Sequence, residues 1–174
     1  MEEKTILIKG LVDEDFVQYK KPSMFIGTCF CGWKCCKDAG RPVTMCQNSP
    51  LSNSKSKVVE FSTLYNRYIN NPITKAIVFG GLEPMLQFDD VMELIKYFRQ
   101  KGCKDDFVIY TGYYEDELQK EIEFIESFIK DYGGKIIVKF GRFIPDQESR
   151  RDETLGVELA SPNQYAKEYN IIHE

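Results

Sequence analysis

Apolar residues along this chain follow two alternating periods. Short runs rich in β-branched and aromatic side chains predict strands over residues 5–8, 24–26, 76–79, 107–110 and 136–140. Between them, apolar residues recur at the spacing of an amphipathic helix, as in Phe88, Val91 and Ile95. This spacing predicts helices over residues 58–69, 88–99 and 115–132. The polar tract at residues 48–56 is predicted to be a loop.

The order of these elements favours an α/β fold. A strand followed by a helix and then another strand is typical of parallel βα units with right-handed crossovers. The 174 residues are too few for a complete eight-stranded barrel, which takes about 250 residues. We therefore expect a partial (β/α) barrel of about five or six mostly parallel strands, formed by residues 1–174 as a single domain.

Charge and composition exclude several classes of function. The net charge of −4 provides no basic field that would attract nucleic acid or acidic lipid. The first apolar run stops at Lys9, so neither a secretory signal nor a membrane span is expected, and the protein is predicted to be cytoplasmic. The single histidine, His173, leaves no basis for a histidine-dependent hydrolytic triad.

The cysteines are the most informative residues of the chain. Four of them crowd into one short stretch and a fifth follows a polar loop: Cys29, Cys31, Cys35, Cys36 and Cys46. In a reducing compartment, thiolates packed this densely are the usual ligands of zinc or of an iron–sulfur cluster. Cys103 stands apart and is interpreted as an ordinary half-buried thiol.

Three unusual segments each follow a predicted strand. The cysteines come after residues 24–26, Gly-Gly-Leu-Glu-Pro at 80–84 comes after 76–79, and Thr-Gly-Tyr-Tyr at 111–114 comes after 107–110. The carboxyl ends of parallel strands meet at one edge of a sheet, and functional loops are concentrated there. We therefore expect the three segments to form one site.

These segments carry a family resemblance. The stretch 25–35, together with Cys46-Gln47-Asn48, resembles the radical S-adenosylmethionine signature, in which Cys-x3-Cys-x2-Cys follows the first strand. Residues 78–87 resemble the Gly-Gly-Glu-Pro segment of the same superfamily. Residues 109–113, Gly141-Arg142-Phe143, Arg151-Asp152 and the tail 160–164 look like segments of the proteins that activate anaerobic ribonucleotide reductase.

The resemblance implies a fold, cofactors and a reaction. It implies a partial barrel of radical S-adenosylmethionine type, with a [4Fe–4S] cluster on Cys31, Cys35 and Cys46 that leaves one iron free for S-adenosylmethionine. Reductive cleavage would give a 5'-deoxyadenosyl radical, which takes a hydrogen atom from a glycine of a partner enzyme. That partner would be a glycyl radical enzyme, such as anaerobic ribonucleotide reductase, and a flavodoxin-like protein would supply the electron.

The same resemblance assigns residues to S-adenosylmethionine. Gly80 and Gly81 would let backbone approach the methionine moiety, Glu83 would fix its amino group, and Thr111 belongs to the neighbouring segment. Two departures from the family pattern leave alternatives open. Ten residues separate Cys35 from Cys46 where the pattern has two, so Cys29 and Cys36 are substitutes for the third ligand. Leu82 also interrupts the Gly-Gly-Glu order and displaces the carboxylate.

Two other functions account for part of the pattern. A zinc-stabilised interaction module would use four of the clustered thiolates, although their spacing is not that of a regular zinc ribbon. A radical enzyme acting on a different glycyl radical protein, or on a peptide, would keep the cofactors and change the target. Iron, sulfide and zinc contents separate the first alternative from the radical one.

Overall fold

The computed structural model describes residues 2–46 and 48–172. Its main sheet has the strand order β10-β7-β6-β5-β3-β2. The inner strands β3 (Ser23–Thr28), β5 (Ala76–Gly81), β6 (Asp106–Tyr110) and β7 (Ile136–Phe140) run parallel to one another. The edge strands β2 (Gly10–Asp15) and β10 (Tyr165–Tyr169) pair antiparallel. The chain is thus an α/β protein with a mixed, mostly parallel sheet, and over the described residues the sheet has two edges and is not closed.

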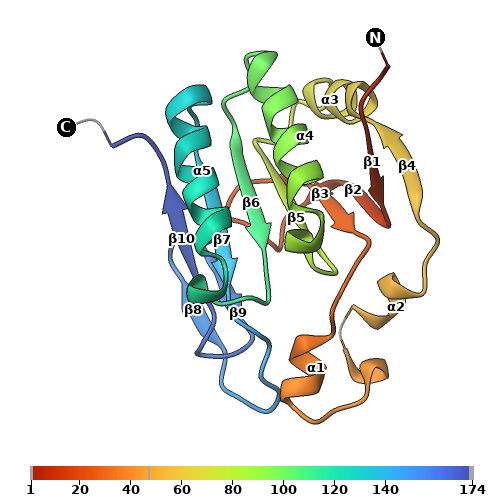
Figure 1. Cartoon of the computed structure of the whole chain (residues 1–174), viewed down its shortest axis with the longest axis vertical. Helices are drawn as coiled ribbons and strands as arrows, with labels where there is room; N and C mark the ends of the chain where they lie inside the picture. The colour runs from red at the N-terminus through yellow and green to blue at the C-terminus, as the bar shows by residue number, and fades with distance from the viewer. Residues whose placement is uncertain (1, 47, 173–174) are drawn as a thin grey trace.

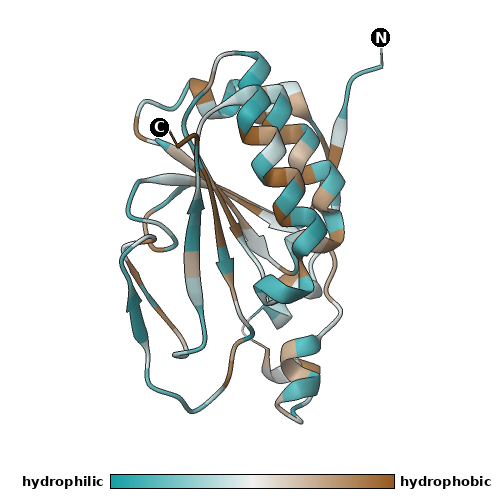
Figure 2. Ribbon diagram, turned by 60° about the vertical axis from the view of Figure 1, so that its left-hand side comes forward, coloured by the Kyte–Doolittle hydropathy of each residue, from teal (hydrophilic) through white to brown (hydrophobic). Residues whose placement is uncertain are grey.

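Helices cover one face of this sheet. In Figure 1, α4 (Phe88–Gln100) and α5 (Gln119–Tyr132) lie in front of β5, β6 and β7, and α3 (Phe61–Ile69) packs beside α4. The strands contribute fully buried aromatic residues to this layer, among them Phe79 and Phe107. In Figure 2 the central strands are largely hydrophobic, and the helices beside them carry both hydrophobic and hydrophilic residues. Burial of the apolar helix stripe against the sheet is the main driving force for this layer.

Non-helical segments cover the opposite face of the sheet. Here Val78, Val108 and Ile137 pack against Tyr19, Leu155 and Leu159. Leu159 belongs to the small antiparallel pair β8 (Arg150–Asp152) and β9 (Val157–Leu159), and Leu155 lies in the turn between these strands. In a closed barrel this face would line the interior, so these residues fill the space that a barrel lumen would occupy.

Several predicted elements are confirmed. The structure has strands at all five predicted positions, β1 (Thr5–Ile8) among them, and α4 matches the predicted helix 88–99. The expected end of the last helix is also present, because α5 stops at Gly133, whose φ is 70°.

Other predictions were wrong. Over the described residues the main sheet has six strands, four of them parallel, but the predicted strand β1 is not among them, because it pairs antiparallel with β4 (Lys57–Glu60) in a separate two-stranded sheet. The predicted helix 58–69 therefore begins as a strand: Val58 and Val59 are β-branched and pair with β1, and α3 starts only at Phe61.

Two further boundaries differ from the prediction. The predicted helix 115–132 is divided into a 3-10 turn, η3 (Glu115–Glu117), and α5. The Glu117 side chain accepts a hydrogen bond from the Tyr114 amide at 2.9 Å and so caps the start of the 3-10 turn. The predicted loop 48–56 contains a short helix, α2 (Ser49–Ser52). In the part of the chain that the structure describes, no helix is both long and apolar enough to cross a membrane.

Candidate metal centre

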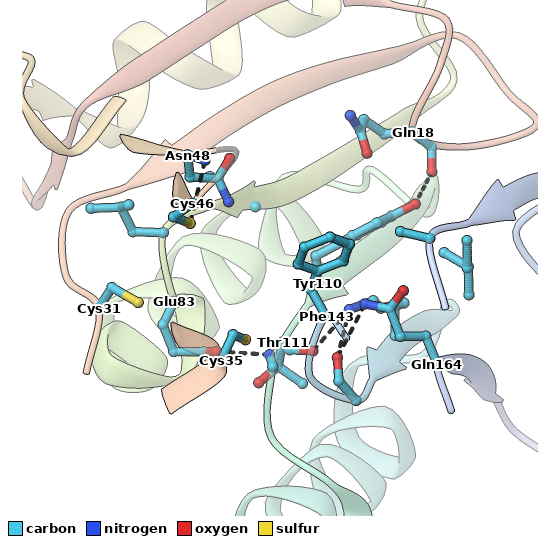
Figure 3. A pocket seen from close by; sticks show the side chains of 18 of the residues that line it. Gln18, Cys31, Cys35, Cys46, Asn48, Glu83, Tyr110, Thr111, Phe143 and Gln164 are labelled. Carbon is cyan, nitrogen blue, oxygen red and sulfur yellow. Dashed lines mark hydrogen bonds between the residues drawn. The ribbon is translucent and has the colours of Figure 1, made fainter. Parts of the chain in front are cut away.

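A cavity of about 350 Å³ lies at the carboxyl ends of the parallel strands. Its walls come from the segments that follow β3, β5, β6 and β7, and also from the residues around Gln18 and Leu159 (Figure 3). The three unusual segments therefore meet at one edge of the sheet, as predicted. Of the residues predicted for the site, those lining this cavity are Cys31, Cys35, Cys36, Cys46, Gly80, Gly81, Glu83 and Thr111.

Three cysteines gather at one end of the cavity (Figure 3). Cys31 follows β3, Cys35 lies in the short helix α1 (Lys34–Asp38), and Cys46 follows the 3-10 turn η1 (Val43–Met45). Burial and, to a smaller extent, charge on the nearby Cys35 and Cys46 raise the pKa of the Cys31 thiol, so the three side chains are close together. The chain thus returns to the cavity after Cys35, and Cys46 lies there although it is far from Cys35 in the sequence.

Backbone amides point at these sulfur atoms. The Trp33 amide donates to Sγ of Cys31 at 3.2 Å, and the Asn48 amide donates to Sγ of Cys46 at 3.4 Å. The backbone of Phe143 also donates to Cys35, which favours its thiolate. Burial nevertheless dominates and raises the pKa values of Cys31 and Cys35. Without a metal these thiols are held protonated, so metal binding would release protons.

The two substitute ligands differ in position. Cys36 is buried, lines the cavity and forms a side-chain hydrogen bond with Cys46. Cys29 is also buried, but it does not line the cavity, and its amide donates to Oε1 of Gln87 at 2.7 Å. All six cysteines are free thiols. If Cys46 is not the third ligand, Cys36 is the better placed of the two alternatives.

Glu83 joins two of the loops that form the site. It follows β5, precedes the 3-10 turn η2 (Pro84–Gln87) and is 7% exposed. Its Oε1 accepts from the Met85 amide at 3.0 Å, and its Oε2 accepts from the Gly112 amide at 2.8 Å. Burial raises the pKa of this carboxyl group. The side chain thus reaches the cavity in spite of the inserted Leu82, and it holds the loops after β5 and β6 at a fixed separation.

The glycines and Thr111 permit close packing here. A Cβ atom on Gly80 would lie 2.9 Å from the Phe25 ring, and Gly81 has a φ of 82°, which residues with a side chain rarely adopt. Thr111 is buried, and its Oγ1 accepts from the Tyr113 amide at 3.0 Å. These residues let the backbone itself form part of the cavity wall.

Sequence reasoning missed Lys139. This lysine is in β7, lines the cavity, and donates from Nζ to the carbonyl oxygens of Thr111 (3.2 Å) and Gly141 (3.0 Å). Burial lowers its pKa to about 8, while the nearby Cys35 and Glu83 favour its charged form. A lysine inside the apolar run Ile-Ile-Val-Lys-Phe is the signal that would have identified it. Lys139 places a cationic group beside the thiols.

Ion pairs fasten the cysteine segment to the neighbouring loops. Arg142 binds Glu117 with Nη1 and Nη2, at 2.7 and 2.8 Å, and also pairs with Asp38 of α1. Arg142 lowers the pKa of Glu117 to about 2. Lys34 pairs with the same Glu117 at 3.3 Å, and Arg41 pairs with Asp146. Most of these groups are exposed to solvent, so each contact contributes little to stability.

The end of the cavity away from Cys31 is more apolar. Phe25, Tyr110 and Val157 line it, and the Tyr110 hydroxyl donates to the Gln18 carbonyl (Figure 3). The Gln164 side chain closes one side, where its Nε2 donates to the Gly141 carbonyl at 3.3 Å. The cavity therefore combines a sulfur-rich end with an aromatic end, and Glu83 and Lys139 lie along it.

The donor set fits an iron–sulfur cluster better than a single ion. Among the described residues, no three histidine, cysteine, aspartate or glutamate side chains converge closely enough to hold one metal ion. Cys31, Cys35 and Cys46 instead surround one end of a cavity. In a [4Fe–4S] cluster each thiolate binds a different iron, so spaced thiols suit the cluster. A structural zinc ion would need four ligands directed at a single point.

Comparison with known families agrees with this donor chemistry. Residues 23–161 match the model of the 4Fe-4S single cluster domain family, and this range includes all the residues predicted for the site. No curated protein and no solved structure matched the chain. Because the family match extends over most of the sequence, the chain belongs to the 4Fe-4S single cluster domain family and is a 4Fe–4S domain of radical S-adenosylmethionine type.

Proposed function

We propose that this chain cleaves S-adenosylmethionine reductively and generates a glycyl radical on a partner enzyme, the anaerobic ribonucleotide reductase. The observation that carries the proposal is the cavity itself, with three cysteine thiols at one end and an aromatic lining at the other. When bound, a [4Fe–4S] cluster on Cys31, Cys35 and Cys46 supplies the electron for cleavage and an iron with a free position.

The residues along the cavity suit the parts of S-adenosylmethionine. Its carboxylate would be attracted by the Lys139 ammonium group, and its amino group by the Glu83 carboxylate. Both side chains already bind backbone groups, so they are held in place before any ligand arrives. The apolar end, with Phe25 and Tyr110, suits an adenine ring.

The size of the cavity supports a protein as the target. A volume of about 350 Å³ lies near the lower end of the range for a pocket that holds one ligand. S-adenosylmethionine would fill it, and Tyr19, Leu155 and Leu159 occupy the space beneath the sheet. The hydrogen donor must then approach from outside, as a backbone loop of a partner does. Val17, which lines the cavity, is 68% exposed, and its neighbour Phe16 is 62% exposed, so the two offer an apolar contact surface for such a partner.

Anaerobic reconstitution tests the proposal. The reconstituted chain is incubated with S-adenosylmethionine and dithionite, and 5'-deoxyadenosine is measured. Anaerobic ribonucleotide reductase is then added, and its glycyl radical is followed by electron paramagnetic resonance. We expect nucleoside formation and a glycyl radical, and reduced flavodoxin should replace dithionite.

The possible failures of this experiment have different meanings. Equimolar zinc without acid-labile sulfide would overturn the radical chemistry and favour the interaction module. Nucleoside formation without a radical on the reductase would overturn the assigned partner, and other glycyl radical enzymes or peptides would then be tested as targets. The Cys103→Ser variant is the matched control, because Cys103 does not line the cavity.

A further inference from the structure

Three glycines on adjacent strands form a hollow in the sheet. Gly10 of β2 pairs with Gly27 of β3, and Gly81 of β5 pairs with Thr28, the next residue of β3. We call Gly10, Gly27 and Gly81 the glycine hollow. Because these residues lack side chains, the hollow admits a side chain from another segment.

Leu51 fills the glycine hollow. A Cβ atom on Gly10 would lie 3.2 Å from Cδ1 of Leu51. Cβ atoms on Gly27 and Gly81 would lie 3.2 and 2.5 Å from its Cδ2. The leucine is therefore in contact with three strands at once, and an added Cβ atom at any of these positions would crowd it, most severely at Gly81.

This contact holds a segment that has little else to hold it. Between Cys46 and Lys57 the sequence is polar except for Pro50 and Leu51, so Leu51 is the large apolar side chain available to attach it. Around it, Asn48, Pro50 and Asn53 are exposed. The carbonyl of Ser52 also accepts a hydrogen bond from the Lys9 side chain, beside the hollow.

The attached segment leads directly to Cys46. Leu51 lies in α2, where the Ser52 amide donates to the Asn48 carbonyl at 3.0 Å. The Ser49 amide donates to the Cys46 carbonyl at 3.0 Å. These two backbone hydrogen bonds join Cys46 to Ser49 and Asn48 to Ser52, within the stretch that carries the anchored leucine. Cys35, in contrast, lies in α1, which Arg142 fastens to the loops after β6 and β7.

We infer that Leu51 is a positioning residue for Cys46, acting through its seat in the glycine hollow. This inference rests on the proposed function, in which Cys46 is the third cluster ligand. It explains how a cysteine so far along the chain from Cys35 reaches the same cavity. The extra residues between Cys35 and Cys46 lengthen this loop, and Leu51 fixes the position at which the loop returns to the sheet.

The first test compares Leu51→Ala with Leu51→Met, which retains a side chain of similar volume. After anaerobic reconstitution, the rate of cluster loss to a chelator is measured. We expect Leu51→Ala to lose its cluster about tenfold faster than the wild type, as is usual when support of a metal ligand is removed. Leu51→Met should restore most of the retention. Ile69→Ala, at the exposed end of α3 and far from α2 in Figure 1, is the matched control.

The second test needs no cluster. Metal-free protein is treated with iodoacetamide, and modification of each cysteine is followed by mass spectrometry. We expect Cys46 to react faster in Leu51→Ala while Cys31 and Cys35 keep their wild-type rates, with circular dichroism unchanged. A general loss of structure would instead accelerate all three. An unchanged rate at Cys46 would overturn the inference.

A substitution in the glycine hollow tests the same contact from the side of the sheet. The Cβ atom of Gly10→Ala would crowd Cδ1 of Leu51, and we expect a loss of cluster retention in the same direction as in Leu51→Ala but smaller. In the double variant Gly10→Ala/Leu51→Ala the two effects should not add, because both remove the same contact. Additive effects, or cluster retention in Leu51→Ala equal to the wild type, would refute the role of Leu51. Failure of the wild type to bind any cluster would refute the proposed function instead, and the iodoacetamide test would still decide about the anchor.

Discussion

The inner strands and the cysteine segment are stabilised in different ways. Strands β5, β6 and β7 are joined by regular parallel pairing and bury Phe79, Phe107 and Phe140 completely. The cysteine segment, residues 29–46 and 48–53, is held by ion pairs, by the hydrogen bond of the Cys29 amide with Gln87 and by Leu51 in the glycine hollow. The sheet therefore determines where the site lies, and the weakly held segment determines what it binds. The two should respond separately to substitution.

The largest expected effect is on cofactor binding. Cys31→Ser or Cys35→Ser should abolish binding of the [4Fe–4S] cluster and S-adenosylmethionine cleavage, because a hydroxyl group is a poor ligand for iron in such a cluster. Iron and sulfide analysis with a 5'-deoxyadenosine assay measures both losses. The metal-free variants should unfold at nearly the wild-type temperature, since these thiols lie outside the sheet. Retention of cleavage in either variant would contradict the ligand assignment.

Substitution of the remaining cysteines identifies the third ligand. Cys46→Ser should match the loss seen for Cys31, while Cys29→Ser and Cys103→Ser should keep the cluster, because neither side chain lines the cavity. Iron content after reconstitution is the measurement. If Cys46→Ser keeps the cluster and Cys36→Ser loses it, then Cys36, which also lines the cavity, is the ligand.

Truncation in the core should have the opposite profile. Phe107 is fully buried and contacts the rings of Phe79 and Phe98, at centroid distances of 6.1 and 5.6 Å. Phe107→Ala should lower the free energy of unfolding by about 3–5 kcal/mol, as is usual for a large cavity in a core. Urea denaturation of the metal-free protein measures this change. Phe124→Ala, on a half-exposed ring, serves as control, and equal losses in both variants would contradict the described core.

A smaller effect concerns pH. Because Arg142 lowers the pKa of Glu117 from 4.5 to about 2, the folded state binds this proton less readily than the unfolded chain. Glu117 therefore contributes stability above about pH 4.5, and the contribution is lost as the pH falls toward 2. For a pair this exposed it amounts to about 1 kcal/mol or less.

Glu117→Gln tests this contribution directly. The variant should be less stable than the wild type near neutral pH, and the difference should shrink between pH 4.5 and 2. The free energy of unfolding across that range is the measurement. A difference that stays constant with pH would mean that the ion pair of Glu117 with Arg142 is not its source.

The elements of the sheet were largely predictable from the sequence. Runs such as 76–79 and 136–140 are continuously apolar, and such runs are typical of strands buried on both faces. The short strands β8 and β10 were missed because they are polar, and their pairing partners give them strand structure. Val58 and Val59 were assigned to a helix because only pairing with β1 distinguishes the two states.

The site residues that lie at or directly after the end of a parallel strand were predictable from the sequence. Cys31, Gly80 and Thr111 were found because residues after parallel strands share one edge. Arg142 with Glu117, and Leu51 with its glycines, were not, because these pairings join segments far apart in the sequence. The site assignments themselves stay predictions until the variants are measured.

One measurement tests the central claim most directly. The reconstituted chain is reduced, and electron paramagnetic resonance spectra are recorded before and after addition of S-adenosylmethionine, with iron, sulfide and zinc determined on the same sample. We expect a [4Fe–4S] signal that changes when S-adenosylmethionine binds, because three cysteine ligands would leave one iron free. Equimolar zinc, or a cluster signal indifferent to S-adenosylmethionine, would contradict it.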